Sequence, residues 1–93
     1  MRSNTSPGGL SLSTNNLIYG QSLNPHHFKR AVGGSNGADA AMVAAKCVPF
    51  AIGCDQLGSM KYAATFNGTV ALKVSRNRCT TEGVSFPNKV GFE

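Results

Sequence analysis

Two serines, Ser35 and Ser59, each follow a glycine and could together support acyl-transfer chemistry. An alanine-rich segment and a short apolar stretch separate them, and a helix followed by a returning strand can bring two such loops to one edge of a sheet. Glycines beside each serine leave backbone N–H groups free to stabilise the negative charge that develops on an attacked carbonyl oxygen. The two loops together therefore predict an acyl-transfer site.

The glycine-rich stretch "GGSNGA", residues 33–38, excludes two other kinds of site. It has neither the spacing and Lys-Ser or Lys-Thr ending of a P-loop nor the G-x-G-x-x-G of a dinucleotide site. It does match the G-x-S-x-G nucleophile elbow, but the residues before it are polar and contain a proline, where that fold needs a strand. The two histidines, His26 and His27, precede the serine, so we do not expect a Ser-His-Asp triad. Adjacent histidines rarely converge on one metal ion, so we expect this pair to be solvated.

One clear helix is predicted over residues 38–46, between the two serines. Ser35 and Asn36 are suitable N-cap residues, and Asp39 lies in the first turn, where the helix dipole favours a negative charge. Alanine, the strongest helix former, predominates, and Pro49 is expected to close the helix. Because the helix is apolar on almost every side, it needs cover from several directions.

Two further apolar stretches have the composition of strands. "VPFAIGC", residues 48–54, is bounded by proline and glycine and fits a buried strand, and "TVALKVS", residues 69–75, reads as a second. Between them we expect one or two turns of helix, from Met60 to Phe66. The order helix, strand, helix, strand indicates a piece of a larger α/β layered structure.

The length of 93 residues allows one domain at most. Residues 1–16 are polar and are expected to form a loose N-terminal segment, followed by a partial domain over residues 17–93. That domain begins with an ordered loop, because Gly20 and Pro25 leave no room for a long element. It ends, from residue 76, in a loop with at most one short strand.

Charge and hydropathy exclude several classes of partner. The net charge is +5, but only 14% of residues are charged and the basic ones are scattered, so we expect no binding to nucleic acid. A small basic binding module remains as a separate hypothesis. The N-terminus lacks the apolar core of a signal peptide, and the longest apolar stretch is too short to span a bilayer. A cytoplasmic location is the expectation, while membrane association and oligomeric state stay open.

The three cysteines, Cys47, Cys54 and Cys79, include no C-x-x-C pair. An odd count with this spacing suggests neither a disulfide framework nor a zinc site. We expect them to be buried free thiols, and we expect no metal and no cofactor.

Residues 14–76, most of the chain, resemble the amidase signature family. The family pattern reads roughly N-P-x-x-x-x-R-x-P-G-G-S-S-G-G, then an alanine-rich helix, then P-x-x-x-G-T-D-x-G-G-S-I-R-x-P-A-x-F-x-G-x-x-G-L-K-P. Order and spacing agree without a gap. The matching residues are Asn24, Pro25, Arg30, Gly33, Gly34, Ser35, Gly37, Ala40, Ala41, Pro49, Gly53, Asp55, Gly58, Ser59, Ala63, Phe66, Gly68, Leu72 and Lys73. The Asn-Pro pair leans slightly toward the fatty-acid amide hydrolase-like branch.

The resemblance implies a fragment of the family's α/β/α fold, with a mixed sheet core, and hydrolysis of a carbon–nitrogen bond in a small-molecule amide. The family mechanism uses a Ser–cis-Ser–Lys triad without metal or cofactor. Ser59 matches the nucleophile, and Ser35 matches the bridging serine that relays its proton to a neutral lysine, with Gly34-Ser35 as the candidate cis peptide bond. The positions matching the oxyanion hole are Gln56, Leu57, Gly58 and Ser59. The structural positions of the signature are Gly33, Gly34, Asn36, Gly37 and Asp55.

Several departures from the family pattern bear on catalysis. The family's lysine base lies several dozen residues before the bridging serine, whereas residues 1–28 contain no lysine and Lys29 is too close in sequence. Leu57 replaces a glycine in the oxyanion turn, and Lys61 replaces an arginine. Two interpretations stay open: a partial amidase whose isolated chain is inactive, and a truncated remnant or partner-binding fragment without catalysis. In either case we expect the isolated chain to fold poorly or to depend on a partner, and the substrate is left open.

Each site residue also has a purely structural interpretation. Ser35 could serve only as a helix N-cap, Ser59 could be an ordinary turn serine, and Asp55 could bond to its own loop. These interpretations are reasonable one by one, but all three positions fall in one spaced pattern. That joint spacing favours the amidase interpretation.

Overall fold

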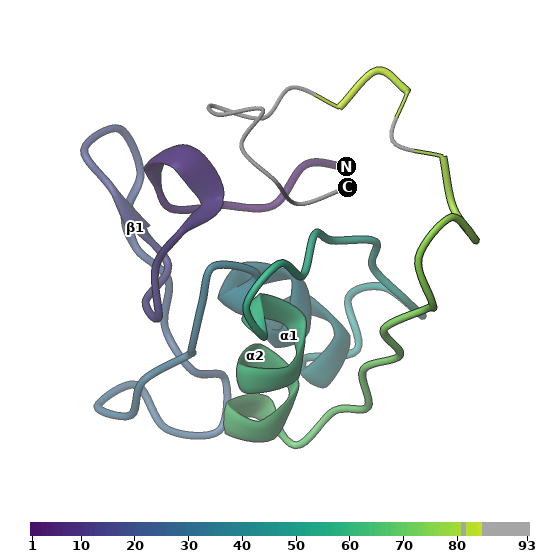
Figure 1. Cartoon of the computed structure of the whole chain (residues 1–93). Coiled ribbons are helices and arrows are strands. Elements are labelled where there is room, and N and C mark those ends of the chain that lie inside the picture. The colour runs from purple at the N-terminus through teal and green to yellow at the C-terminus, as the bar shows by residue number, and fades with distance from the viewer. Residues whose placement is uncertain (81, 85–93) are drawn as a thin grey trace.

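The computed structural model describes residues 1–80 and 82–84, so the C-terminal part of the tail, with any short strand there, lies outside the described residues. A 3-10 helix (Pro7–Gly9) comes first, followed by strands β1 (Asn15–Asn16) and β2 (Gly20–Gln21) and helices α1 (Gly37–Ala44) and α2 (Ser59–Asn67) (Figure 1). Both helices predicted from the sequence are therefore present.

Helix α1 ends earlier than the sequence suggests. Lys46 adopts a left-handed backbone conformation with φ of 60°. The N–H of Cys47 then donates to the carbonyl oxygen of Met42 over 2.9 Å, a bond that closes the last turn of a helix. This turn ends the helix at Ala44, so the expectation that Pro49 closes it was wrong.

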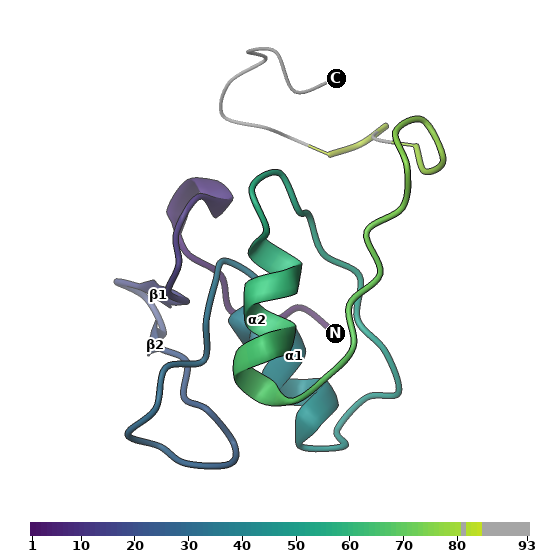
Figure 2. The ribbon, with the colours of Figure 1, turned by 60° about the horizontal axis from the view of Figure 1, so that its bottom comes forward.

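The two helices pack against each other, as Figure 2 shows. The buried apolar residues are Val32, Ala38, Ala63 and Ala64. Alanine side chains let helix backbones approach closely. Because three of these four residues are alanines, the core buries little apolar side-chain volume. Helix α2 ends at Gly68, whose φ of 65° is the left-handed conformation typical of a glycine helix stop.

Residues 48–54 and 69–75 form no strand, which corrects two predictions. Phe50, Ile52 and Val70 are 71%, 87% and 99% exposed. A strand needs a neighbour to receive its backbone hydrogen bonds, and neither segment pairs with another within the described residues. The sheet of the described residues is a two-stranded antiparallel one, and a mixed sheet core is not seen in them.

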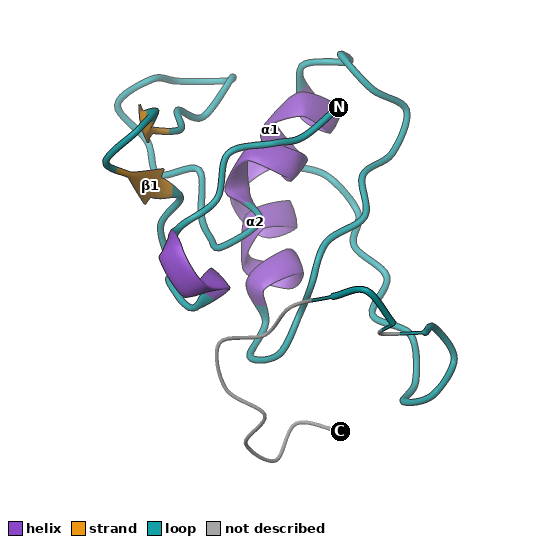
Figure 3. Cartoon of the chain, turned by 90° about the horizontal axis from the view of Figure 1, so that it is seen from above, coloured by secondary structure: helices purple, strands orange, loops and turns teal. Residues whose placement is uncertain are grey.

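The N-terminal hairpin and the segment before it are held by polar contacts. Asn16 Oδ1 accepts hydrogen bonds from the N–H groups of Ile18, at 3.0 Å, and Tyr19, at 2.8 Å, and so shapes the turn between β1 and β2 (Figure 3). Ser6 and Thr14, both in the segment expected to be loose, are buried. These two side chains therefore pack into the described part of the chain.

All three cysteines are exposed, which corrects the expectation of buried thiols. Cys54 ends one of the two apolar stretches that lack a sheet to cover them, and this accounts for its exposure. In the part of the chain that is described, no helix has the length and apolar character needed to cross a membrane.

Candidate functional site

The loop that carries Ser35 is enclosed by the N-terminal segment. Ser35 is only 2% exposed, and its Oγ lies 4.0 Å from where a Cβ on Gly9 would stand. A Cβ on Gly34 would lie 2.5 Å from the carbonyl oxygen of Ser13, so only glycine allows the two segments to approach this closely. The peptide bond between Gly34 and Ser35 is cis. The candidate bridging serine thus lies in a closed turn.

Thr14 lies inside this turn, although nothing in the sequence around it indicates a role in the site. Its side chain is fully buried, at 0% exposed. The hydroxyl oxygen lies 2.9 Å from the carbonyl oxygen of Gly33 and 3.2 Å from that of Ser35. It also accepts a hydrogen bond from the N–H of Gly37 over 2.9 Å. A polar residue in a polar N-terminal stretch carries no periodicity that would reveal its burial.

Asn24 connects the segment that precedes this loop to helix α2. Its side-chain amide donates to the carbonyl oxygens of Ala31, at 3.0 Å, and Phe66, at 2.8 Å. Its Oδ1 accepts the N–H of His26 over 2.9 Å. The asparagine of the Asn-Pro pair is 2% exposed and has every side-chain polar atom bonded, so its role in this structure is to join segments.

Asn67 makes a second connection, to Val32, which follows Ala31 in the chain. Its side-chain amide donates to the carbonyl oxygens of Val32, at 2.7 Å, and Ala63, at 2.8 Å. Asn67 is 0% exposed, and its Oδ1 has no partner among the described residues. His26 Nε2 lies 2.9 Å from the Asn67 carbonyl oxygen. The glycine-serine loop and α2 are therefore connected through neighbouring carbonyl groups.

Ser59 is the first residue of α2 and follows the turn residue Gly58. Gly58 has φ of 105°, a conformation that favours glycine. Leu57, which replaces a glycine of the family pattern, is not among the residues with positive φ, and its side chain is 68% exposed. The substitution is accommodated because Gly58 takes the unusual backbone angle.

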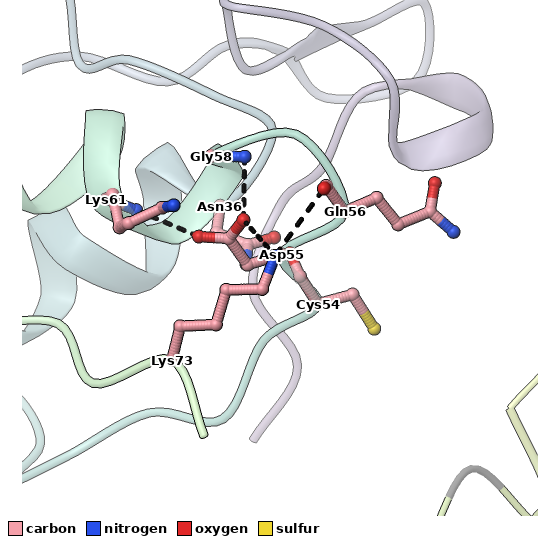
Figure 4. A network of polar contacts seen from close by, with 7 residues as sticks. All are labelled: Asn36, Cys54, Asp55, Gln56, Gly58, Lys61 and Lys73. Carbon is pink, nitrogen blue, oxygen red and sulfur yellow. Dashed lines mark hydrogen bonds and ion pairs between the residues drawn. The ribbon is translucent and has the colours of Figure 1, made fainter. Parts of the chain in front are cut away.

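Asp55 holds the start of α2 with both carboxylate oxygens, as Figure 4 shows. Oδ1 accepts the N–H of Gly58 over 2.6 Å, and Oδ2 accepts the N–H of Lys61 over 3.4 Å. The Lys73 ammonium lies 3.4 Å from Oδ1, and the Asp55 side chain is 2% exposed. A negative charge at this end complements the helix dipole.

The environment of Asp55 keeps it ionised. Burial raises the pKa of its carboxyl, but the N–H groups of Gly58 and Lys61 and the Lys73 ammonium together outweigh burial, so the pKa lies below 3.8. Lys73 Nζ also lies 3.5 Å from the carbonyl oxygen of Gln56. The ion pair therefore ties the extended segment after α2 to the loop that precedes it.

Not all four N–H groups of the predicted oxyanion hole are free. The Gly58 N–H is used by Asp55. Within residues 1–80 and 82–84, no acceptor is bonded to the N–H groups of Gln56, Leu57 and Ser59. Ser59 begins α2, and the first N–H groups of a helix have no partner in the helix itself and favour an anion. Gln56 and Leu57 lie in the loop before the helix.

Asn36 connects the two serine loops. It precedes α1 but makes no side-chain bond to cap it. Its amide Nδ2 donates instead to the carbonyl oxygen of Cys54 over 2.9 Å, next to Asp55. In the described part of the chain, the hydroxyls of Ser35 and Ser59 share no hydrogen bond, and the bonds of Ser35 are made by its carbonyl oxygen. The loops are joined, but the serines are not in direct contact.

Two surface hollows, of about 440 and 300 Å³, lie away from both serines. One is lined by Val43 and residues 46–49, the other by residues 25–29. Among the described residues, no group of three His, Cys, Asp or Glu side chains could hold a metal ion.

Known proteins of one family are similar in sequence to this chain. The sequence model of the Amidase family matches residues 1–92. Among curated relatives, the A subunit of glutamyl-tRNA(Gln) amidotransferase from Methanospirillum hungatei is 41% identical over 83 residues, which are 89% of this chain and 19% of the relative. The same subunit from Clostridium botulinum strain Eklund 17B is 44% identical over 72 residues, 77% of this chain and 15% of the relative. The chain thus spans less than a fifth of the length of these relatives.

These relatives correct one detail of the sequence interpretation. They are amidotransferase subunits, whereas the Asn-Pro pair had suggested the fatty-acid amide hydrolase-like branch. The pair does not need a branch-specific explanation, because Asn24 joins two backbone segments. By its family match and its relatives, the chain belongs to the Amidase family.

Proposed function

We propose that this chain carries the nucleophile and the bridging serine of a site that hydrolyses carbon–nitrogen bonds in amides. The observation that carries the proposal is the position of Ser59, at the start of α2. Its own N–H and those of Gln56 and Leu57 have no acceptor among the described residues. A nucleophile beside free backbone N–H groups, from the loop at Gln56 and Leu57 and from the start of α2, is the arrangement that stabilises an oxyanion.

In the proposed mechanism, Ser59 Oγ attacks the amide carbonyl while Ser35 passes the Ser59 proton to a neutral lysine. The tetrahedral intermediate places its negative oxygen at the N–H groups of Gln56, Leu57 and Ser59. When the intermediate collapses, the carbon–nitrogen bond breaks and the amine leaves with the proton returned through Ser35. Water then hydrolyses the acyl-serine by the same path in reverse. No lysine in this sequence matches the base, so another polypeptide segment would supply it.

We propose that the site works within a larger amidase assembly. The curated relatives are named as subunits of glutamyl-tRNA(Gln) amidotransferase. Exposed apolar stretches beside the loop of Asp55 offer surface that further amidase segments would cover. The substrate would be an amide of small size, held by those further segments.

The alternative function is a partner-binding fragment without catalysis. It is supported by the absence of a direct Ser35–Ser59 hydrogen bond in the described residues and by the Gly58 N–H being occupied by Asp55. In this case the serine loops have only the structural roles that serines play in turns and at helix starts.

A fluorophosphonate probe, which reacts with activated serines, tests the two functions. Labelling of the wild-type chain that disappears in Ser59→Ala, and falls in Ser35→Ala, would support the nucleophile and its relay. Ser75→Ala is a matched control, because Ser75 is exposed in the extended segment after α2. Circular dichroism checks that each sample is folded. Because the lysine would come from another segment, labelling is measured with added methylamine as an external amine base. A folded wild-type chain that takes no label even with the amine present would favour the partner-binding alternative.

A further inference from the structure

Thr14 is the centre around which the turn of Ser35 is built. Three backbone groups of residues 33–37 point at its hydroxyl: the carbonyls of Gly33 and Ser35 and the N–H of Gly37. No other side chain bonds to all three within the described residues. From the chain alone, residues 14 and 35 are far apart, and only the fold brings them together.

A hydroxyl makes a limited number of hydrogen bonds, and this limit decides which of the three contacts of Thr14 are donated and which are accepted. A threonine hydroxyl has one hydrogen to donate and two lone pairs that accept. It accepts from Gly37, at 2.9 Å, and the shorter of its two carbonyl contacts, 2.9 Å to Gly33, is where the hydrogen goes. The carbonyl of Ser35 then takes its hydrogen bond from Thr5, whose Oγ1 lies 3.4 Å away. The three backbone groups around Thr14 thereby each have a partner.

We propose that Thr14 is a positioning residue for the amidase site: its hydroxyl fixes the backbone on both sides of Ser35 and thereby aims the bridging serine. The inference rests on the proposed function of Ser35. Its geometry is also tight, because a Cβ on Gly37 would stand 2.5 Å from the Thr14 hydroxyl oxygen. No substitution of Gly37 can keep this contact unchanged, so the two residues are matched in shape as well as in bonding.

The test compares Thr14→Val, which keeps the branched shape and removes the hydroxyl, with Thr14→Ser, which keeps the hydroxyl. Thr65→Val is the matched control, because Thr65 Oγ1 also donates to a backbone carbonyl, that of Lys61 at 2.9 Å, but on the exposed face of α2. Hydrogen exchange of single amides is followed by NMR in the full 93-residue chain. The Tyr62 amide, bonded to the carbonyl of Gly58 at 2.8 Å, reports on α2.

In Thr14→Val we expect the Gly37 amide to exchange about tenfold faster or more, while the Tyr62 amide keeps its rate. Thr14→Ser should restore the slow exchange of Gly37, and Thr65→Val should leave it unchanged. A slow Gly37 amide in Thr14→Val would overturn the inference. So would a wild-type Gly37 amide that exchanges as fast as an unstructured glycine, since the bond would then not exist.

Fluorophosphonate labelling adds the functional readout. The rate of Ser59 labelling should fall in Thr14→Val and recover in Thr14→Ser, and an unchanged rate in Thr14→Val would overturn the positioning role. If the folded wild-type chain takes no label even with an added amine base, the proposed nucleophile fails. The exchange rates then still decide whether Thr14 holds the turn.

Discussion

The side-chain amide of Asn36 donates to the carbonyl oxygen of Cys54 over 2.9 Å, and so links the residue after one candidate catalytic serine to the residue before Asp55. Asn36 stands where the family pattern has a second serine. A serine side chain is shorter and has one donor fewer. The Asn36 side chain therefore links the two serine loops. The shorter serine of the family pattern would be less able to make this link.

Replacing Asn36 with alanine should loosen this link. Because the bond is partly buried, its loss should lower the free energy of unfolding by about 1 kcal/mol. Urea denaturation measures the change. Asn15→Ala is the control, since Asn15 is exposed and its side chain makes no bond among the described residues. Equal stability of Asn36→Ala and Asn15→Ala would contradict the proposed role of the link.

Asp55 should make stability depend on pH in the acid range. Its folded pKa lies below the usual 3.8, so its contribution is fully present above 3.8 and is lost as the pH falls through the folded pKa. Asp55→Asn removes this contribution. The variant should be less stable than wild type at pH 7, and the difference should shrink below about pH 4. A difference that stays constant from pH 7 to pH 2 would show that charge is not the cause.

Asp39 should behave in the opposite way. Burial raises the pKa of its carboxyl, and a hydrogen bond from the Ser3 hydroxyl only partly offsets this. An acid whose folded pKa is raised destabilises the fold at neutral pH, and the penalty disappears as the pH falls through that pKa. Asp39→Asn should therefore be more stable than wild type at pH 7 and equal to it in acid. Lower stability of Asp39→Asn at pH 7 would mean that the helix dipole outweighs burial.

Asn67 should matter more to stability than Asn36. Its amide makes two short bonds in a fully buried position, and Asn67→Ala leaves the carbonyl oxygen of Val32 without this donor. The expected loss is about 1–3 kcal/mol, measured by urea denaturation. Asn15→Ala again serves as the exposed control. A loss no larger than in the control would mean that the loop and α2 are held together by other contacts.

The helices could be predicted from the sequence because their signals are local. Alanine content, an acidic first turn and glycine stops act within a few residues, and α1 and α2 each carry some of them. The bounds of α1 could not be predicted, because the left-handed conformation of Lys46 has no strong sequence signal. The predicted strands failed for the opposite reason: a strand depends on a neighbour that local composition cannot supply.

Only those residues of the candidate site that match the family pattern could be predicted from the sequence. Ser35, Ser59 and the oxyanion loop stand at matching positions, and their roles remain proposals. Thr14 and Asn67 were missed because each acts by bonding backbone groups that lie 19 and 35 positions away in sequence. Buried polar residues of this kind have no periodicity, so composition alone classed the stretch around Thr14 as loose.

The apolar stretches on either side of α2 should make the isolated chain self-associate. Phe50, Ile52 and Leu72 are 71%, 87% and 78% exposed, and such surfaces promote association. A triple variant with serine at these positions should remain monomeric at concentrations where wild type forms larger species, as measured by analytical ultracentrifugation. The control carries serine at Leu17 and Ile18, which are also apolar and exposed but lie in the hairpin turn. If only the control prevents association, the hairpin turn is the surface through which the chain self-associates. If wild type is monomeric at every concentration, the apolar stretches beside α2 do not promote association.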